Sequence, residues 1–156
     1  DKIQTINNVD TPFGAGMLTF QISPDTQLNS LNEISNSCAL LFLQSSGKKT
    51  LQDLMNNPAL IKQFFSGSGK ADGILKVDKY IAMPGQEITL HIDRSEGAKY
   101  VGVIAGYYPF PGKKHMLLLD IPVDVVENGW WKKSLHASLS PLSEKISMGK
   151  ESISIK

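Results

Sequence analysis

Short segments in which apolar and polar residues alternate recur along the chain, most clearly over residues 18–22, 88–92 and 135–139. Such a period of two predicts β-strands with one face turned toward a core. Two further segments, 37–44 and 100–107, are almost continuously apolar, which is typical of strands covered on both faces. The pattern therefore favours a two-sheet antiparallel β-sandwich over a parallel sheet, which would need a helix after most strands.

One region, about residues 50–66, has helical spacing instead. Thr50 stands where an N-cap is expected, and Pro58 suits the first turn of a second helix. Apolar residues recur at three- and four-residue spacings within both segments, which predicts amphipathic helices whose apolar faces need a sheet to cover. We therefore expect a small helical insertion in a mostly β fold.

The strand pattern also predicts which side chains form the core. The residues expected to face inward are Phe20, Leu41, Ile88, Leu90, Val101, Val103, Leu119 and Ile121. Trp130 and Trp131 follow the turn signal Asn128-Gly129. Because adjacent residues of a strand face opposite sides, we expect one tryptophan to pack and the other to be exposed.

The chain has 156 residues, a length that fits one domain. Residues 1–14 are mostly polar and are expected to form an N-terminal tether, and residues 15–156 a single β-sandwich domain that includes the helical insertion. The segment Ser23–Asn36 is dense in Pro, Asn, Asp and Ser and is expected to be a long loop. Its apolar residues Leu28, Leu31 and Ile34 either pin the loop to the domain or contact a partner, and we expect at least one of them to pin it.

Composition narrows the classes of function. The chain carries 16 basic and 15 acidic residues, a net charge of +1, which argues against a dedicated nucleic-acid or membrane-surface binder. Cys38 is the only cysteine, so an internal disulfide and a cysteine-based zinc site are both excluded. It lies in an apolar run and is expected to be a small buried side chain.

No catalytic or metal-binding motif emerges from the residues. His91 and Asp93 share a strand face, but no spacing supplies further ligands, and Asp120 and Asp124 lie about 13 Å apart on an extended strand. The segment Ser66–Lys70 lacks the glycine and the hydroxyl residue that a phosphate-binding loop requires. We therefore expect no catalytic residue, no metal and no cofactor.

The order of several segments is nevertheless distinctive. They are Leu31-Asn32, the strand Ala39–Gln44, Phe64-Phe65, the turn Met83-Pro84-Gly85-Gln86, the run Ala98–Tyr107 and Trp130-Trp131-Lys132. In this order the chain resembles the TssJ family, the outer-membrane lipoprotein of the bacterial type VI secretion system. The turn Pro84-Gly85 followed by Tyr100–Tyr107 carries most of the resemblance, which spans residues 18–142.

The resemblance implies a transthyretin-like β-sandwich in the periplasm, held at the inner leaflet of the outer membrane by a lipidated cysteine expected just before Asp1. It also implies docking to the periplasmic domain of TssM through the loop between the first two strands, which here is Ser23–Asn36. The loop is expected to contribute little to folding stability. Its expected contact residues are Gln27, Leu28, Asn29, Leu31 and Asn32.

Two alternatives to this assembly role remain open from the sequence. One is a periplasmic β-sandwich that binds a small ligand, for example between the helical insertion and the sheet. The other is a hydrolase with a scattered site, which is disfavoured because no nucleophile and base stand together. A lipidation signal ending in cysteine before Asp1 would support the assembly role, for which no small-molecule substrate and no nucleic acid are expected.

Overall fold

The computed structural model describes residues 1–156 and contains ten strands, three α-helices and one turn of 3-10 helix. Most of the elements predicted from the alternation are present. In chain order they are α1 (Lys2–Asn7), β1 (Gly14–Pro24), β2 (Cys38–Ser45), α2 (Lys48–Met55), α3 (Pro58–Phe65), β3 (Ile74–Ala82), β4 (Ile88–Arg94), β5 (Tyr100–Ala105), η1 (Lys113–His115), β6 (Met116–Asp120), β7 (Val123–Asn128), β8 (Ser134–Leu139), β9 (Leu142–Met148) and β10 (Ile153–Ile155).

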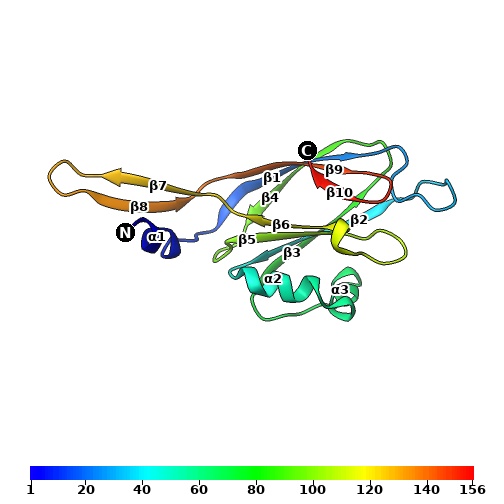
Figure 1. The fold of residues 1–156 in the computed structure, drawn as a ribbon, viewed down its shortest axis with the longest axis horizontal. Coiled ribbons are helices and arrows are strands. Elements are labelled where there is room, and N and C mark those ends of the chain that lie inside the picture. Colours follow the sequence, from blue (N-terminus) through cyan, green and yellow to red (C-terminus); the bar gives the residue numbers. More distant parts are fainter.

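The strands form two four-stranded sheets and a separate two-stranded hairpin (Figure 1). The first sheet has the order β10-β9-β1-β4 and the second the order β3-β2-β5-β6. The predicted β-sandwich is therefore confirmed, with one difference. All pairs are antiparallel except β1 and β9, which run parallel, so the first and the penultimate strands of the chain lie side by side at the centre of one sheet.

A single apolar core fills the space between the two sheets. Phe20 of β1 and Phe42 of β2 meet there, with ring centroids 4.8 Å apart. Seven of the eight predicted inward residues belong to this core. Phe20, Val101, Val103 and Ile121 are buried in it, and Ile88, Leu90 and Leu119 are partly buried against it.

Leu41 is also fully buried, but on the opposite face of the second sheet. Strand β2 is apolar on both faces: Leu40 and Phe42 point into the sandwich, whereas Leu41 and Leu43 point toward α2 and α3. The prediction that Leu41 lies between the sheets is therefore wrong. The continuous apolar run of β2 is explained because the helices cover its outer face, as the sequence pattern predicts for this strand.

The two helices of the insertion begin in different ways. Helix α3 begins as predicted, with Pro58 at its first position and with the Asn57 side chain accepting a hydrogen bond of 3.1 Å from the Leu60 N–H. Helix α2 begins two residues before Thr50, with Gly47 at the N-cap and no side-chain cap. Thr50 is thus not the cap, and α2 depends on burial of Leu51 and Leu54 against the sheet.

The hairpin of β7 and β8 projects away from the sandwich, and α1 lies beside it (Figure 1). Residues 1–14 are therefore not a free tether: α1 packs on the hairpin, and Gly14 already begins β1. The backbone oxygens of Thr11 and Pro12 accept hydrogen bonds from the Gly97 N–H (2.7 Å) and from Nε of Arg94 (3.2 Å). These bonds hold the connecting segment on the sandwich.

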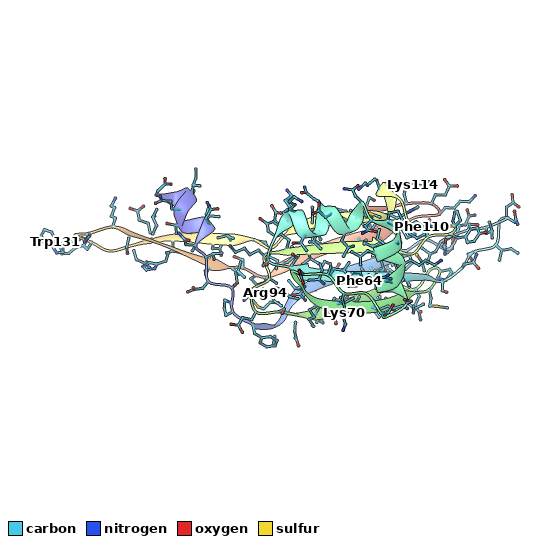
Figure 2. All side chains as sticks on the ribbon, turned by 90° about the horizontal axis from the view of Figure 1, so that it is seen from below. Phe64, Lys70, Arg94, Phe110, Lys114 and Trp131 are labelled. Atoms are coloured by element: carbon cyan, nitrogen blue, oxygen red, sulfur yellow. The ribbon has the colours of Figure 1, made fainter.

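The pair Trp130-Trp131 lies at the tip of this hairpin, and both side chains are exposed, by 89% and 91%. The prediction that one of them packs is wrong, because both lie in the turn between β7 and β8, where the alternating faces of a strand do not apply. Figure 2 shows Trp131 at one extreme of the molecule, with Phe110 and Lys114 toward the other. The molecule is thus elongated, with two chemically different ends.

Candidate partner-binding site

The loop between β1 and β2 lies at the end of the sandwich opposite the hairpin (Figure 1). It begins with a turn in which the Asp25 side chain accepts a hydrogen bond of 2.7 Å from the Gln27 N–H. The Asp25 N–H donates to the Met148 carbonyl (2.8 Å), and the Asp25 carbonyl accepts from the Gly85 N–H (3.1 Å). The start of the loop is therefore fixed to the first sheet and to the β3–β4 turn.

Leu28 folds back from this turn into the core and is fully buried. It thus pins the loop to the domain, as the sequence analysis expects for at least one of the three apolar residues. Its side chain is not accessible to a partner, which corrects its assignment as a contact residue. Because Leu28 is part of the main core, we now expect the loop to contribute to folding stability through this residue, in contrast to the expectation from the sequence.

Asn29 joins the loop to the segment after β5. Its φ is +46°, a left-handed conformation that asparagine tolerates better than most residues. Its side-chain nitrogen donates to the Ser37 carbonyl (3.0 Å), and its side-chain oxygen accepts from the Tyr108 N–H (2.9 Å). Because the side chain is buried and both of its polar atoms are bonded, Asn29 positions the site rather than contacting a partner.

The tip of the loop is a small hairpin of its own. Leu31 and Ile34 exchange two backbone hydrogen bonds, of 2.9 and 3.0 Å, across Asn32 and Glu33. Both intervening residues have positive φ, +51° and +65°, as in a type I′ turn. This tight turn presents Leu31 and Ile34 to solvent, with 43% and 68% of their surface exposed.

An open groove of about 610 Å³ lies beside this tip. Its lining includes Leu31 from the loop tip, Phe65 at the end of α3, and Tyr108, Pro109 and Phe110 from the segment after β5. Tyr108 is largely exposed, and Phe110 is exposed by a little more than one-third. The sequence analysis missed these two aromatic residues because the segment reads as a turn, although its density of aromatic and proline residues is a usable signal.

Two buried rings support the groove from below. The rings of Tyr107 and His115 stack with centroids 4.4 Å apart. The Tyr107 hydroxyl donates to the Gly149 carbonyl (2.8 Å), and burial is the main reason that the pKa of this phenol is raised. The segment after β5 is therefore bonded to the β1–β2 loop through Asn29 and to the β9–β10 turn through Gly149.

His115 is held as a neutral ring. Its Nδ1 accepts from the Gly112 N–H (2.8 Å), so its Nε2 must carry the proton that is shared with the Glu151 carbonyl (2.7 Å). A second proton would have no acceptor. Burial and the neighbouring Lys114 lower the pKa of His115, in agreement with this geometry.

The other candidate groups do not form a reactive site. Burial raises the pKa of the Cys38 thiol to about 12, so this cysteine is an inert core residue. His91 lies beside the Thr19 hydroxyl (3.2 Å) on an exposed sheet face, and no three His, Cys, Asp or Glu side chains cluster. The interface of α2 and α3 with the sheet, where a ligand was considered, is filled by apolar side chains.

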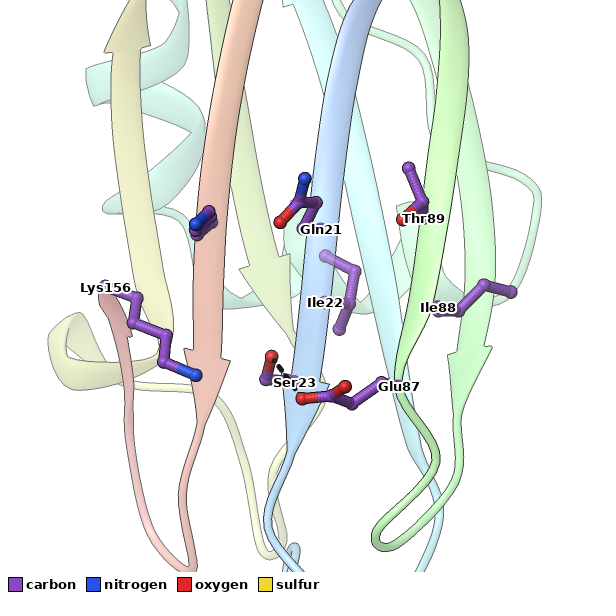
Figure 3. Close-up of a pocket in the computed structure, with 8 residues that line it drawn as sticks. Gln21, Ile22, Ser23, Glu87, Ile88, Thr89 and Lys156 are labelled. Carbon is purple, nitrogen blue, oxygen red and sulfur yellow. Dashed lines mark hydrogen bonds between the residues drawn. The ribbon is translucent and has the colours of Figure 1, made fainter.

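A second depression, of about 450 Å³, lies on the outer face of the first sheet (Figure 3). Its polar lining includes Ser23, whose hydroxyl donates to the Glu87 carboxylate (3.2 Å). No histidine lines it, so Ser23 has no base that would activate it as a nucleophile. The loop tip and the aromatic groove therefore form the best-defined candidate site.

Comparison with known proteins assigns the chain to a family. The model of the type VI secretion lipoprotein family, which includes VasD, EvfM and TssJ, matches residues 17–140. The chain belongs to the type VI secretion lipoprotein family. The resemblance to TssJ that the sequence suggested is thereby confirmed. Among curated proteins, none matches this chain by sequence.

Several solved structures from this secretion system have the same fold. Lip of Serratia marcescens, a membrane-bound component, is 19% identical, with a TM-score of 0.62 over 89% of this chain and 96% of that one. TssJ1 of Pseudomonas aeruginosa is 15% identical, with a TM-score of 0.61 over 94% and 95%. A chain in a structure of the TssM C-terminal domain from EAEC is 15% identical, with a TM-score of 0.62 over 89% and 96%.

The helices of this type VI secretion lipoprotein are short, none exceeding eight residues. None of them has the length and apolar character needed to cross a lipid bilayer.

Proposed function

We propose that this chain is a non-enzymatic structural component of the type VI secretion membrane complex. A lipid on a cysteine just before Asp1 anchors it to the periplasmic face of the outer membrane, and the chain binds the periplasmic domain of TssM. The observation that carries the proposal is the exposed apolar tip and groove at the end of the sandwich opposite the N-terminus, in a chain of this lipoprotein family.

The candidate surface has the composition of a protein interface. Leu31 and Ile34 from the loop and Tyr108 and Phe110 from the segment after β5 supply an apolar centre. Gln27 and Asn32 are exposed beside them and supply hydrogen-bonding groups. An apolar, partly aromatic centre with a polar rim is typical of protein–protein interfaces.

We assign the residues of the loop to two roles. Gln27, Leu31 and Asn32 contact the TssM domain, and Ile34, Tyr108 and Phe110 join them. Leu28 and Asn29 give the loop its shape from within the domain. Because this shape is fixed before binding, little ordering of the loop is needed when the partner docks.

The arrangement of the two ends fits an anchored connector. The N-terminus lies beside the hairpin, whereas the β1–β2 loop lies at the opposite end of the molecule (Figure 1), where Leu31 of its tip lines the groove. A lipid attached before Asp1 would hold the hairpin end at the membrane and direct the loop tip into the periplasm. This orientation makes the candidate surface accessible to a partner whose periplasmic domain extends from the inner membrane.

Binding to the purified periplasmic domain of TssM tests the proposal. A Leu31→Ser/Ile34→Ser variant is expected to lose affinity at least about tenfold in calorimetry, because two apolar anchors of the interface are removed. Val77→Ser on β3, another exposed apolar position, is the matched control and should leave the affinity unchanged. Unchanged affinity in the loop variant, or no binding of the unaltered chain, would contradict the proposal.

The anchor is tested separately in cells. The full gene is expected to encode a cysteine immediately before Asp1, and labelling with a radioactive fatty acid should mark the protein. Replacement of that cysteine by serine should abolish the label and release the protein from the outer-membrane fraction. A labelled serine variant, or a different residue at this position, would contradict lipid anchoring.

A further inference from the structure

The hairpin of β7 and β8 carries the most exposed apolar residues of the molecule. Trp130 and Trp131 are about nine-tenths exposed and contact each other edge to face, with ring centroids 5.4 Å apart. Large apolar side chains exposed together in this way usually mark an interaction site. The strands beneath them pair with each other and not with the sandwich sheets, so the tip stands apart from the domain.

The tip has a defined shape. Gly129 has a φ of +107°, and a side chain on it would collide with the Lys132 carbonyl, so this glycine closes the turn. The Ser134 hydroxyl donates to the Asn128 carbonyl (3.2 Å) across its base. The turn therefore presents both tryptophans to solvent, and Figure 2 shows Trp131 at the extreme of that end of the molecule.

Basic residues follow the tryptophans directly. Lys133 pairs with Glu127 at 3.4 Å, whereas Lys132 forms no ion pair. Although the net charge of the whole chain is only +1, the tip carries two basic residues, Lys132 and Lys133, and one acidic residue, Glu127. Tryptophan beside lysine is the combination that favours the boundary between lipid headgroups and acyl chains, where the ring is half buried and the ammonium meets anionic headgroups.

The neighbouring helix adds apolar surface at the same end. Ile3 and Ile6 of α1 are exposed, and α1 packs on β7 and β8. The hairpin extends beyond α1 and the N-terminus (Figure 1). A chain tethered to a bilayer just before Asp1 would therefore bring the tryptophans to the lipid surface.

We propose that the tip of the β7–β8 hairpin is a second membrane contact, which inserts Trp130 and Trp131 into the headgroup boundary of a bilayer that contains anionic lipid. The orientation of the domain on the membrane relies on the lipid anchor of the proposed function. The affinity of the hairpin tip for lipid is independent of that anchor. The contact fixes how the domain stands on the membrane, which a single flexible lipid tether cannot do.

A bilayer suits this tip better than a protein partner does. Two tryptophans bury at most about 500 Å² together, less than the roughly 800 Å² that each partner of a standard protein interface buries. The depression on the hairpin is polar, does not include the tryptophans, and is lined by residues of the N-terminal segment and of β8. A fluid layer of lipid headgroups can accommodate the two tryptophan side chains without a surface of complementary shape.

The chain offers a clean probe because these two residues are its only tryptophans. Their intrinsic fluorescence therefore reports on the tip alone. The chain without a covalently attached lipid is mixed with vesicles of phosphatidylethanolamine and phosphatidylglycerol. We expect the tryptophan emission to shift to shorter wavelength and brominated lipids in the vesicles to quench it. Emission that stays at the solvent-exposed wavelength with vesicles in large excess at low salt would overturn the proposal.

Variants separate the tip from other surfaces in vesicle co-sedimentation. Trp130→Ser/Trp131→Ser should abolish sedimentation with the vesicles, and Lys132→Ser/Lys133→Ser should weaken it about tenfold and reduce its salt dependence. Tyr108→Ser/Phe110→Ser removes two exposed aromatic residues at the other end and should sediment like the unaltered chain. Equal losses in both aromatic variants would mean non-specific adsorption and would overturn the proposal.

The TssM experiment distinguishes the two proposals. The tryptophan variant should bind the TssM domain with unchanged affinity, because its altered residues lie at the opposite end. Loss of TssM binding in this variant, with no response of the unaltered chain to vesicles, would make the tip a protein contact and overturn the membrane assignment. Failure of the unaltered chain to bind TssM would overturn the proposed function and leave the vesicle result standing.

Discussion

Asn29 and Tyr108, 79 residues apart in the chain, are joined by a hydrogen bond of 2.9 Å from the Tyr108 N–H to the Asn29 side-chain oxygen. This bond couples the β1–β2 loop to the segment after β5. The exposed tip of the loop and the two aromatic residues of the groove are therefore held in a fixed relation. The candidate surface is a composite of two loops, and its shape depends on a residue that solvent scarcely reaches.

Replacing Asn29 by alanine should lower the free energy of unfolding by about 1–3 kcal/mol, because the Ser37 carbonyl and the Tyr108 N–H lose their buried partner. The affinity for the TssM domain should fall with it, since the two halves of the surface are released. Urea denaturation and calorimetry measure the two effects. Gln27→Ala, at an exposed position, should leave stability unchanged, and equal stability of both variants would contradict this role of Asn29.

Leu28 and Leu31 lie three residues apart, but their replacement should change the free energy of unfolding by very different amounts. Leu28→Ala should cost about 2–5 kcal/mol of stability, because it leaves a cavity in the main core. Leu31→Ala should change stability by less than about 0.5 kcal/mol, because its side chain already faces solvent. Denaturant midpoints measure both changes, and a stable Leu28 variant would show that the loop is not pinned at this residue.

His115 should make stability depend on pH. Its pKa is lowered in the folded state, so the unfolded chain binds a proton first as the pH falls below 6.5. The stability from neutral His115 is complete above this pH and decreases below it, until the folded state is protonated as well.

Urea denaturation on both sides of pH 6.5 measures this effect. His115→Gln should flatten the dependence of stability on pH over this range. His136→Gln, at an exposed histidine, should retain the dependence of the unaltered chain. If the free energy of unfolding of the His115 variant depends on pH as that of the unaltered chain does, other titratable groups cause the dependence.

Glu33 is in a left-handed conformation that glycine adopts without steric cost. Glu33→Gly should therefore keep or raise the free energy of unfolding, by up to about 1 kcal/mol. Glu96→Gly is the matched control: this glutamate also lies in a turn but not at positive φ, so its replacement should lower stability. The shift in melting temperature measures both, and a clear loss in the Glu33 variant would contradict the type I′ turn.

The sequence predicts the sandwich well because the relevant signal is local. The alternation of β1 and β4 and the two apolar runs specify strands and their degree of burial without knowledge of their neighbours. The sequence alone could not decide which residues of β2 face the other sheet and which face the helices. Leu41 and Phe42 are equally apolar, and only the position of α2 and α3 separates their environments.

The candidate site was predictable in location but not in detail. The length and polarity of the β1–β2 segment point to it, but the burial of Leu28 depends on strands remote in the sequence. The alternation rule also failed for the tryptophans, because it applies to residues within a strand, and both lie in the turn that joins β7 to β8. Helix α1 was missed because six residues form a stable helix only when other elements pack against them.

The parallel pairing of β1 with β9 has a consequence for the order of folding. The first strand of the sandwich lacks one of its two neighbours until residues 142–148 have been synthesised, so the sheet cannot close on a growing chain. Up to that point the apolar face of β1 has no complete layer to protect it. The first sheet can therefore be completed only after residues 142–148 have become available to pair with β1, wherever the chain folds.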